Sequence, residues 1–260
     1  MRPILTLLVC LFASQFSSLS LAVEQFSYRV LDKKPNDRAN YVQGLEIHAG
    51  KLYLSAGEYG KSKLRRYDLE TMALEQEQRL NPRLFAEGIT RLDDKLYQLT
   101  WRAGMMLEFD FETLKPIKWH PISGQGWGLT TNGEHLIYTD GGHHLHFITP
   151  GKPGKQHSVA VTMAGVPVNH LNELEWIDGK VWANIYQTDR IVIISPDTGE
   201  VTANISLDGL LPTAERKPNT DVLNGIARNP ENGAIWVTGK RWPWLYQIEL
   251  VPHPSEQESR

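Results

Sequence analysis

The chain has 260 residues, of which 41% are hydrophobic, and it carries a net charge of −3 at neutral pH. This length and apolar content suffice for one large domain with its own core. The slightly negative balance, without a cluster of Lys and Arg interleaved with aromatic residues, argues against binding to nucleic acid or to an anionic membrane.

The first 22 residues have the features of a secretory signal peptide. Arg2 is the only charged residue before Glu24, residues 4–13 are almost wholly apolar, and Ser20-Leu-Ala22 fits the small-x-small cleavage rule. The alternative is a short membrane anchor, but a bilayer-spanning helix needs about 20 apolar residues. We therefore predict cleavage after Ala22. Residues 23–260 would then form a single domain without a stable membrane anchor, in the periplasm or outside the cell.

Cysteine and histidine usage bears on metal binding. Cys10 is the only cysteine and lies in the predicted signal peptide, so the mature chain would contain none. This excludes disulfides, a cysteine nucleophile and thiolate-bound zinc. The nine histidines have no metal-ligand spacing; the densest group is His143, His144 and His146, which strand alternation would turn to opposite faces. We therefore predict neither a metal nor a cofactor.

From residue 41 onward the chain repeats one pattern five times. Each repeat opens with a polar or aromatic residue, then a Gly (once Glu173), then an aliphatic residue. A turn dipeptide such as Asn132-Gly133 leads to a second apolar strand, as in a β-hairpin. A third strand follows in every repeat and a fourth in all but the last. The opening stretches are residues 41–46, 85–90, 126–130, 171–175 and 223–227.

Four short strands, repeated five times at a period of about 40–50 residues, are typical of a β-propeller. We therefore predict an all-β, five-bladed propeller. The fifth repeat ends at Leu250 without its fourth strand, and residues 26–31, before the first repeat, supply a strand that would close the ring. Closure removes exposed sheet edges. The alternative is a β-sandwich with accidental hairpin similarity.

The first strand of each propeller blade lines the central channel, so the five residues before the Gly positions should meet near one channel mouth. They comprise one carboxylate, three amides and one indole: Glu87, Gln43, Asn172, Asn224 and Trp127. A polar channel lining that only binds water is the alternative interpretation of this ring.

Loops after the second strands should rise from the same face as this ring. They place Trp101, Tyr186 and Trp242 at matching positions, with Lys240 nearby. Aromatic walls above a carboxylate, amides and a lysine suit a small polar ligand on an apolar stem. Each Trp taken alone is more often packed between blades, and a lone lysine is more often solvated.

The repeats carry motifs that resemble the glutaminyl-peptide cyclotransferase (glutamine cyclotransferase) family of plant and bacterial type, from about residue 26 to 250. The fold of that family is a five-bladed propeller, in agreement with the repeat count. The matching motifs are Gln43-Gly-Leu45, Glu87-Gly-Ile-Thr90, Leu96-Tyr-Gln-Leu-Thr-Trp101, Gly126-Trp-Gly-Leu-Thr130, Leu171-Asn-Glu-Leu-Glu175, Val181-Trp-Ala-Asn184, Asp221-Val-Leu-Asn-Gly-Ile-Ala227 and Thr238-Gly-Lys240 with Trp242-Pro243.

The resemblance implies an enzyme that converts N-terminal glutamine of peptides or proteins to pyroglutamate and releases ammonia, without a catalytic zinc. It also implies roles for matching residues of this chain. Glu87, Asn172 and Lys240 would be catalytic, whereas Gln43, Trp101 and Trp127 would shape the substrate pocket. We expect a monomer.

Two positions depart from the family pattern. Gln125 stands where members usually have Glu, and Tyr186 stands where many have Trp. The first change removes a charge near the mouth, and the second trims one aromatic wall. Two other function classes remain open: a non-catalytic periplasmic propeller that binds peptides or sugars, and a metal-dependent propeller hydrolase of the lactonase type. The hydrolase would need several carboxylates and amides around a cation, where this ring offers Glu87, Glu173 and a lysine.

Overall fold

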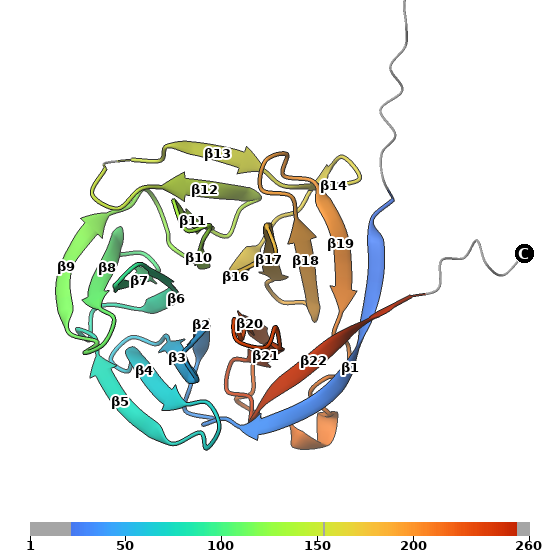
Figure 1. The fold of residues 1–260 in the computed structure, drawn as a ribbon, viewed down its shortest axis with the longest axis horizontal. Helices are drawn as coiled ribbons and strands as arrows, with labels where there is room; N and C mark the ends of the chain where they lie inside the picture. The colour runs from blue at the N-terminus through green and yellow to red at the C-terminus, as the bar shows by residue number, and fades with distance from the viewer. Residues whose placement is uncertain (1–21, 153, 254–260) are drawn as a thin grey trace, which may run out of the picture.

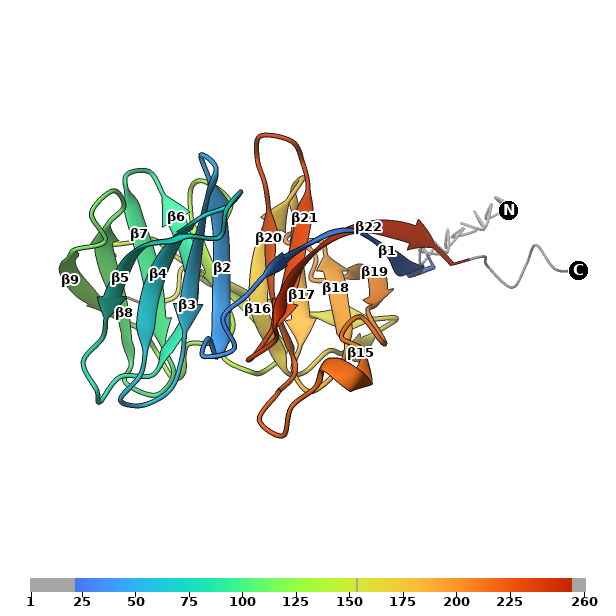
Figure 2. The same cartoon turned by 90° about the horizontal axis from the view of Figure 1, so that it is seen from below.

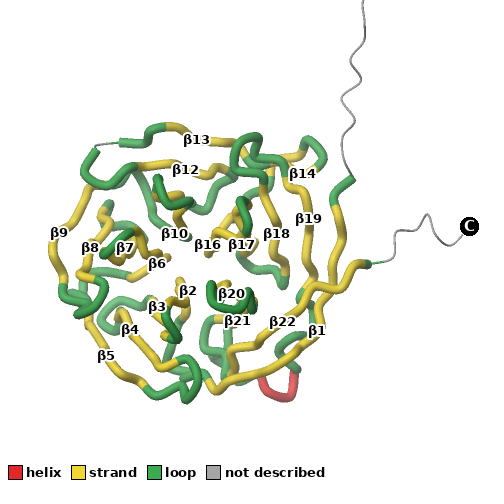
Figure 3. The backbone as a smooth tube through the Cα atoms, in the orientation of Figure 1, coloured by secondary structure: helices red, strands yellow, loops and turns green. Residues whose placement is uncertain are grey.

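The computed structural model describes residues 22–152 and 154–253. The predicted signal peptide lies outside the described residues, apart from Ala22. Within those ranges the regular structure is almost entirely β-strand, and the one helical segment is a 3-10 turn, η1 (Thr213–Glu215) (Figure 3). No helix in the described ranges is long and apolar enough to cross a membrane. The all-β prediction is confirmed.

The sheets stand around a common centre, which the innermost strands surround (Figure 1). Seen from the side, the strands of neighbouring sheets run roughly alongside one another (Figure 2). Each innermost strand packs against the next one around a closed cycle, and the first and fourth of them also contact each other across the centre. In cyclic order these strands are β2 (Val42–His48), β6 (Ala86–Leu92), β10 (Leu129–Thr131), β16 (Leu171–Ile177) and β20 (Leu223–Arg228).

Three of the inner strands begin separate four-stranded antiparallel sheets, whose strands follow the chain order from the centre outward. The predicted second, third and fourth strands are present in all three. The outer strands are β3 (Lys51–Ala56), β4 (Lys63–Asp68), β5 (Leu74–Arg79), β7 (Lys95–Thr100), β8 (Met105–Asp110), β9 (Pro116–Pro121), β11 (Leu136–Tyr138), β12 (His144–Ile148) and β13 (His157–Ala160).

The other two inner strands belong to one eight-stranded sheet, in the order β16-β17-β18-β19-β1-β22-β21-β20. The N-terminal strand pairs antiparallel with the C-terminal strand over residues 26–35 and parallel with β19 over residues 24–26. The parallel pairing was not predicted, and neither was the small hairpin of β14 (Thr162–Met163) and β15 (Val166–Pro167). The remaining strands are β17 (Lys180–Ile185), β18 (Arg190–Ile194), β19 (Val201–Ser206), β21 (Ile235–Gly239), β22 (Trp244–Pro252) and β1 (Glu24–Pro35).

The hydrophobic core consists of layers between neighbouring sheets. One layer joins Tyr53 and Leu64 of one sheet to Ile89 and Phe109 of the next. A second strand such as β3 is therefore buried on both faces along most of its length. This explains why apolar residues run consecutively there, where a half-exposed strand would alternate.

Glycines allow the inner strands to approach closely. A Cβ on Gly128 would lie 1.9 Å from the backbone oxygen of Asn172, and one on Gly88 would lie 2.5 Å from the backbone nitrogen of Leu129. Both distances are impossible without moving the backbone. The matching position on β16 holds Glu173, which is fully buried.

Glu173 reaches across the centre of the ring. Its carboxylate accepts hydrogen bonds from the backbone N–H of Leu45 on β2, at 3.2 Å, and of Ile226 on β20, at 2.8 Å. A buried N–H without an acceptor is costly, so Glu173 satisfies two donors that neighbouring strands leave free. The side chain thereby joins three inner strands.

A half-buried carboxylate on the inner strand β2 makes stability depend on pH. Glu46 accepts hydrogen bonds from Thr90 and from the backbone of Arg91, but burial is the larger effect and raises its pKa to about 7. The folded protein therefore holds this proton more tightly than the unfolded chain, whose Glu pKa is near 4.5. Its contribution to stability falls as the pH rises from about 4.5 to 7.

We expect the Tm of Glu46→Gln to vary less than that of the unsubstituted protein between pH 4.5 and 7. For a domain of this size, each kcal/mol lost corresponds to about 2–4 °C. Circular dichroism melts of both proteins across this pH range measure the effect. Taking the difference between the two Tm profiles cancels the contributions of histidines, which both proteins share. Parallel Tm profiles for the two proteins would contradict the assignment to Glu46.

Candidate active site

A pocket of about 370 Å³ opens at one end of the ring of inner strands. Part of its lining lies at the beginning of the inner strands and the rest in the loops that follow second strands, as the repeat pattern predicts. The lining residues are Tyr41, Gln43, Phe85, Glu87, Trp127, Asn172, Glu58, Trp101, Tyr186 and Lys240.

Backbone irregularities coincide with the polar lining residues. The pairing register shifts around Gln43 on β2, around Glu87 on β6 and around Asn172 on β16. A bulge of this kind bends the strand and re-aims a side chain. The same interruption that directs these side chains toward the pocket also frees backbone groups that need other partners.

Polar residues at the ends of the second strands supply those partners. Ser55 donates a hydrogen bond to the backbone oxygen of Glu87 at 2.5 Å, and Thr139 donates to that of Asn172 at 2.9 Å. Asn184 accepts from the backbone N–H of Gly225 at 2.9 Å. Each bond joins the end of the second strand of one repeat to the inner strand of the next repeat, and thereby stabilises the bulge of that inner strand. These supporting residues were not predicted.

Glu87 is the buried carboxylate of the pocket, with 5% of its surface exposed. The side-chain amide of Gln43 donates to its Oε1 at 3.3 Å. Burial raises the pKa of Glu87 well above its usual range, and the positive charge of Lys240 opposes that shift. A carboxyl group with a raised pKa in a pocket is a candidate proton acceptor near neutral pH.

Lys240 is directed into the pocket by a tight turn after β21. A Cβ on Gly239 would lie 2.2 Å from the indole of Trp242, so only glycine lets that ring fold back over the turn. Lys240 is 3% exposed, and its Nζ lies 4.8 Å from the ring centroid of Tyr186 and 5.1 Å from that of Tyr41. Burial lowers the pKa of Lys240, whereas Glu87 and Asp221 oppose the decrease.

Aromatic rings make up two walls of the pocket. In the first, Phe85 packs edge-on against Trp101, with centroids 5.5 Å apart, and against Tyr41 at 6.2 Å. In the second, Trp127 and Tyr186 meet edge-to-face at 5.5 Å. Such walls can hold the methylene groups of a short side chain between them while the polar end reaches the floor.

Two predicted substrate-binding residues do not line the pocket. Asn224 is completely buried behind Gln43, to whose Oε1 it donates a hydrogen bond at 3.3 Å. Trp242 is also buried, and its indole N–H donates to the backbone oxygen of Asp221 at 2.9 Å. The other seven predicted residues are brought together: Gln43, Glu87, Trp101, Trp127, Asn172, Tyr186 and Lys240.

Three lining residues were missed by the sequence analysis. Tyr41 and Phe85 stand two residues before Gln43 and Glu87, a spacing that places side chains on the same face of an extended chain. That shared offset was an available signal. Glu58 lies in the loop after β3 with a φ of 140°; the repeat pattern puts this loop on the pocket face, but the residue itself was not singled out.

The histidine cluster differs in one respect from the expectation. His143 precedes β12, and its ring centroid lies 4.2 Å from that of His144, so the two rings are adjacent and not on opposite faces. In the part of the chain that the structure describes, no group of three or more His, Cys, Asp or Glu side chains is arranged to hold a metal ion. Metal independence of the chain stays a prediction.

Comparisons with known proteins agree on one family. The family described as glutamine cyclotransferase matches residues 4–250. A glutaminyl-peptide cyclotransferase of Arabidopsis thaliana is 38% identical over 246 residues, which cover 91% of this chain and 75% of the plant protein. The crystal structure of Myxococcus xanthus glutaminyl cyclase superposes with a TM-score of 0.82 at 32% identity, covering 89% of this chain and 99% of that one.

Proposed function

The chain belongs to the glutamine cyclotransferase family, and we propose that it cyclises the N-terminal glutamine of peptides or proteins to pyroglutamate with release of ammonia. The observation that carries the proposal is the burial of Glu87 and Lys240 in one aromatic-walled pocket. An N-terminal glutamine fits this arrangement because it has an amine to deprotonate, a carbonyl to polarise and two methylenes between them. The remaining peptide extends through the open mouth.

In the proposed reaction the α-amine attacks the side-chain amide carbon of the same residue. The amine must be neutral to attack, and its reference pKa is about 7.7–8.0, so near neutral pH most of it must lose a proton. Glu87 accepts the proton and orients the nitrogen. Burial raises the pKa of Glu87, which makes its carboxylate a stronger base than an ordinary one. Because nucleophile and electrophile belong to one side chain, holding it in a folded conformation supplies much of the rate.

The attack forms a C–N bond and places negative charge on the amide oxygen. Lys240 and Asn172 donate hydrogen bonds to this oxyanion, which is the stage at which preorganised donors act most strongly. The bond to the amide nitrogen then breaks as Glu87 returns the proton to it, and ammonia leaves. The attacking nitrogen still carries one proton more than the lactam needs, and the released ammonia takes it up as ammonium, so the chain needs no external acid.

We further propose that the fold is a five-bladed β-propeller closed by the N-terminal strand. The closed cycle of five inner strands supports five blades, and the pairing of β1 with β22 supplies the fourth strand of the last blade. We also propose that the predicted signal peptide directs export of the chain. The mature protein would then act as a monomer on peptides in the periplasm or outside the cell.

The direct experiment is to incubate the purified protein with a peptide that begins with Gln and to follow ammonia release together with the matching mass loss. We expect turnover that survives extensive treatment with a chelator. A matched peptide that begins with Asn is the control, because its shorter side chain would close a strained four-membered ring. A protein that binds the Gln peptide without turnover would be a binding protein, and activity abolished by the chelator and restored by metal would favour a metal-dependent enzyme.

A further inference from the structure

Asp221 lies directly behind Lys240. The backbone N–H of Asp221 donates to the carbonyl of Lys240 at 3.0 Å, and the N–H of Lys240 donates to the carbonyl of Val222 at 2.9 Å. The carboxylate of Asp221 accepts a hydrogen bond from the hydroxyl of Tyr41 at 2.7 Å and one from the backbone N–H of Val222 at 2.8 Å. The indole of Trp242 fixes the Asp221 backbone oxygen. Asp221 is thus held on several sides.

Tyr41 connects this carboxylate to the pocket. Its hydroxyl donates to Asp221, while its ring faces the ammonium of Lys240. Burial, together with the bond to Asp221, raises the pKa of Tyr41, so the hydroxyl remains a donor over the physiological pH range. Tyr41 therefore contacts Lys240 through its ring and Asp221 through its hydroxyl oxygen.

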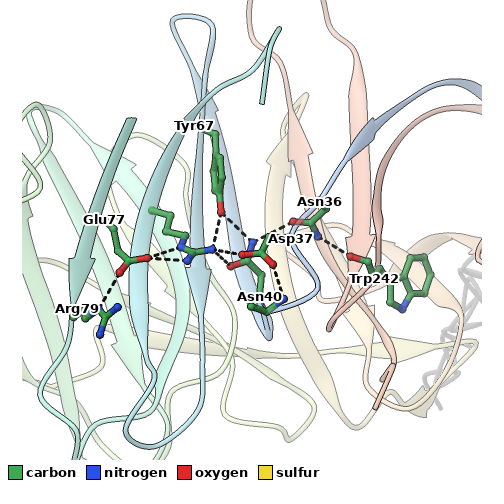
Figure 4. Close-up of polar contacts among 9 residues, drawn as sticks. Asn36, Asp37, Asn40, Tyr67, Glu77, Arg79 and Trp242 are labelled. Atoms are coloured by element: carbon green, nitrogen blue, oxygen red, sulfur yellow. Dashed lines mark hydrogen bonds and ion pairs between the residues drawn. The ribbon is translucent and has the colours of Figure 1, made fainter. Parts of the chain in front are cut away.

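The segment that carries Tyr41 is itself fastened to the turn that carries Lys240. The side chain of Asn36 donates to the backbone oxygen of Trp242 at 3.2 Å (Figure 4), and the backbone N–H of Arg241 donates to the oxygen of Asn40 at 2.8 Å. Arg65, which is buried, bonds both Asp37 and Asn40 of this segment at 2.8 Å.

Arg38 connects the segment that carries Tyr41 to the loop that leads to Asp221. Arg38 donates to the backbone oxygen of Glu215 at 2.6 Å and to the hydroxyl of Thr220 at 3.2 Å. Residues 36–41, 215–221 and 239–242 are therefore cross-linked by hydrogen bonds into one support behind the pocket. Neither Arg38 nor Arg65 lines the cavity, so this support lies outside the pocket.

We propose that Asp221 and Tyr41 are positioning residues for the cyclisation reaction, which hold the Lys240 ammonium charged and aimed at the developing oxyanion. The inference rests on the proposed function. Asp221 supplies a counter-charge that persists while Glu87 exchanges its proton with the substrate. Tyr41 keeps the Asp221 carboxylate in place and presents its ring to the ammonium, an arrangement that favours a cation.

Several other groups bear on the charge of Lys240. Glu87 faces it across the pocket and favours the ammonium form, as Asp221 does. Tyr186 presents its ring from the loop after β17. Arg241, the next residue, is paired with Glu58 at 2.8 Å, so these two charges largely cancel at the mouth. Asp221 is therefore the counter-charge that the proton cycle of Glu87 leaves unchanged.

The test compares Asp221→Asn and Tyr41→Phe with the unsubstituted protein in pH profiles of kcat and kcat/KM for a Gln peptide. Loss of a nearby opposite charge lowers the pKa of a lysine by about one unit or more. For Asp221→Asn we expect the alkaline limb to move down by at least that amount and kcat to fall about tenfold, with little change in KM. Tyr41→Phe should shift the limb in the same direction by a smaller amount. Asp94→Asn, in an exposed turn, is the matched control and should leave the profile unchanged.

A second measurement does not depend on catalysis. Labelling with acetic anhydride at a series of pH values, followed by peptide mass mapping, reports the pKa of Lys240 itself. We expect a lower value in Asp221→Asn than in the unsubstituted protein or Asp94→Asn. An unchanged Lys240 pKa in a folded Asp221→Asn protein would overturn the inference. If Asp221→Asn does not fold, Tyr41→Phe decides by the same criterion. A lowered pKa in a protein without cyclase activity would instead overturn only the proposed function.

Discussion

Replacement of Glu87 by Gln is expected to reduce kcat by about 10²–10⁴-fold, the usual contribution of a general acid–base group. The amide is nearly the same size, and it can still contact Gln43, whose side chain is the hydrogen-bond partner of Glu87. It cannot accept the proton of the substrate amine. Steady-state assays of ammonia release measure the loss, and a thermal melt should be unchanged or slightly higher because a buried ionisable group has been removed.

The pH dependence of the unsubstituted enzyme supplies a second readout of the same residue. Because burial raises the pKa of Glu87 well above 4.5, activity that needs the carboxylate form should be lost as the pH falls through that raised value. The acid limb of kcat/KM should accordingly lie well above pH 4.5. Near-normal turnover of Glu87→Gln would show that another group takes the proton and would contradict the mechanism.

Replacement of Glu173 by Leu is expected to give the largest loss of stability of any single change in the centre of the ring. The leucine leaves the backbone N–H groups of Leu45 and Ile226 without acceptors in a buried environment. Each unsatisfied donor costs about 1–3 kcal/mol. At about 2–4 °C per kcal/mol for a domain of this size, the Tm should fall by on the order of 10 °C.

Glu173→Gln is the matched control for this experiment. Its amide oxygen can still accept from one of the two N–H groups, so it should lose less stability than the leucine variant. Circular dichroism melts at constant pH measure both. Equal Tm values for Glu173→Leu and the unsubstituted protein would mean that the bridge across the centre contributes nothing. A loss of turnover without a change in Tm would instead assign Glu173 to the reaction.

The repeat pattern predicted most of the fold because strand, turn and inner position are local features. A Gly after a polar residue, a turn dipeptide and a second apolar strand each leave a mark within a few residues. The second strands are buried on both faces, which produces consecutive apolar residues such as Leu52 and Tyr53. The parallel contact between β1 and β19 left no such mark, since it depends on how two distant chain segments meet.

The same limit applies to the pocket. Glu87 was placed at the channel mouth by its matching position in the repeats, whereas Lys240 was singled out by the family resemblance, and the structure places both in the pocket lining. Trp242 occupied a matching position too, but the turn after β21 folds its ring inward over Gly239. The position of a residue in its repeat determines at which end of the ring of inner strands it lies. The backbone conformation of a short turn decides whether its side chain enters the pocket or the core.

The sequence by itself determined the all-β architecture, the inner strands and six of the pocket residues, because these follow from local periodicity and repeated positions, while the family resemblance added Lys240. Only the tertiary structure decided that Tyr41 and Asp221 meet behind Lys240, although 180 residues separate them along the chain. It also decided that Asn224 and Trp242 support the pocket from behind. Contacts of this kind depend on ring geometry and on bulges that bring distant segments together, and no local pattern encodes them.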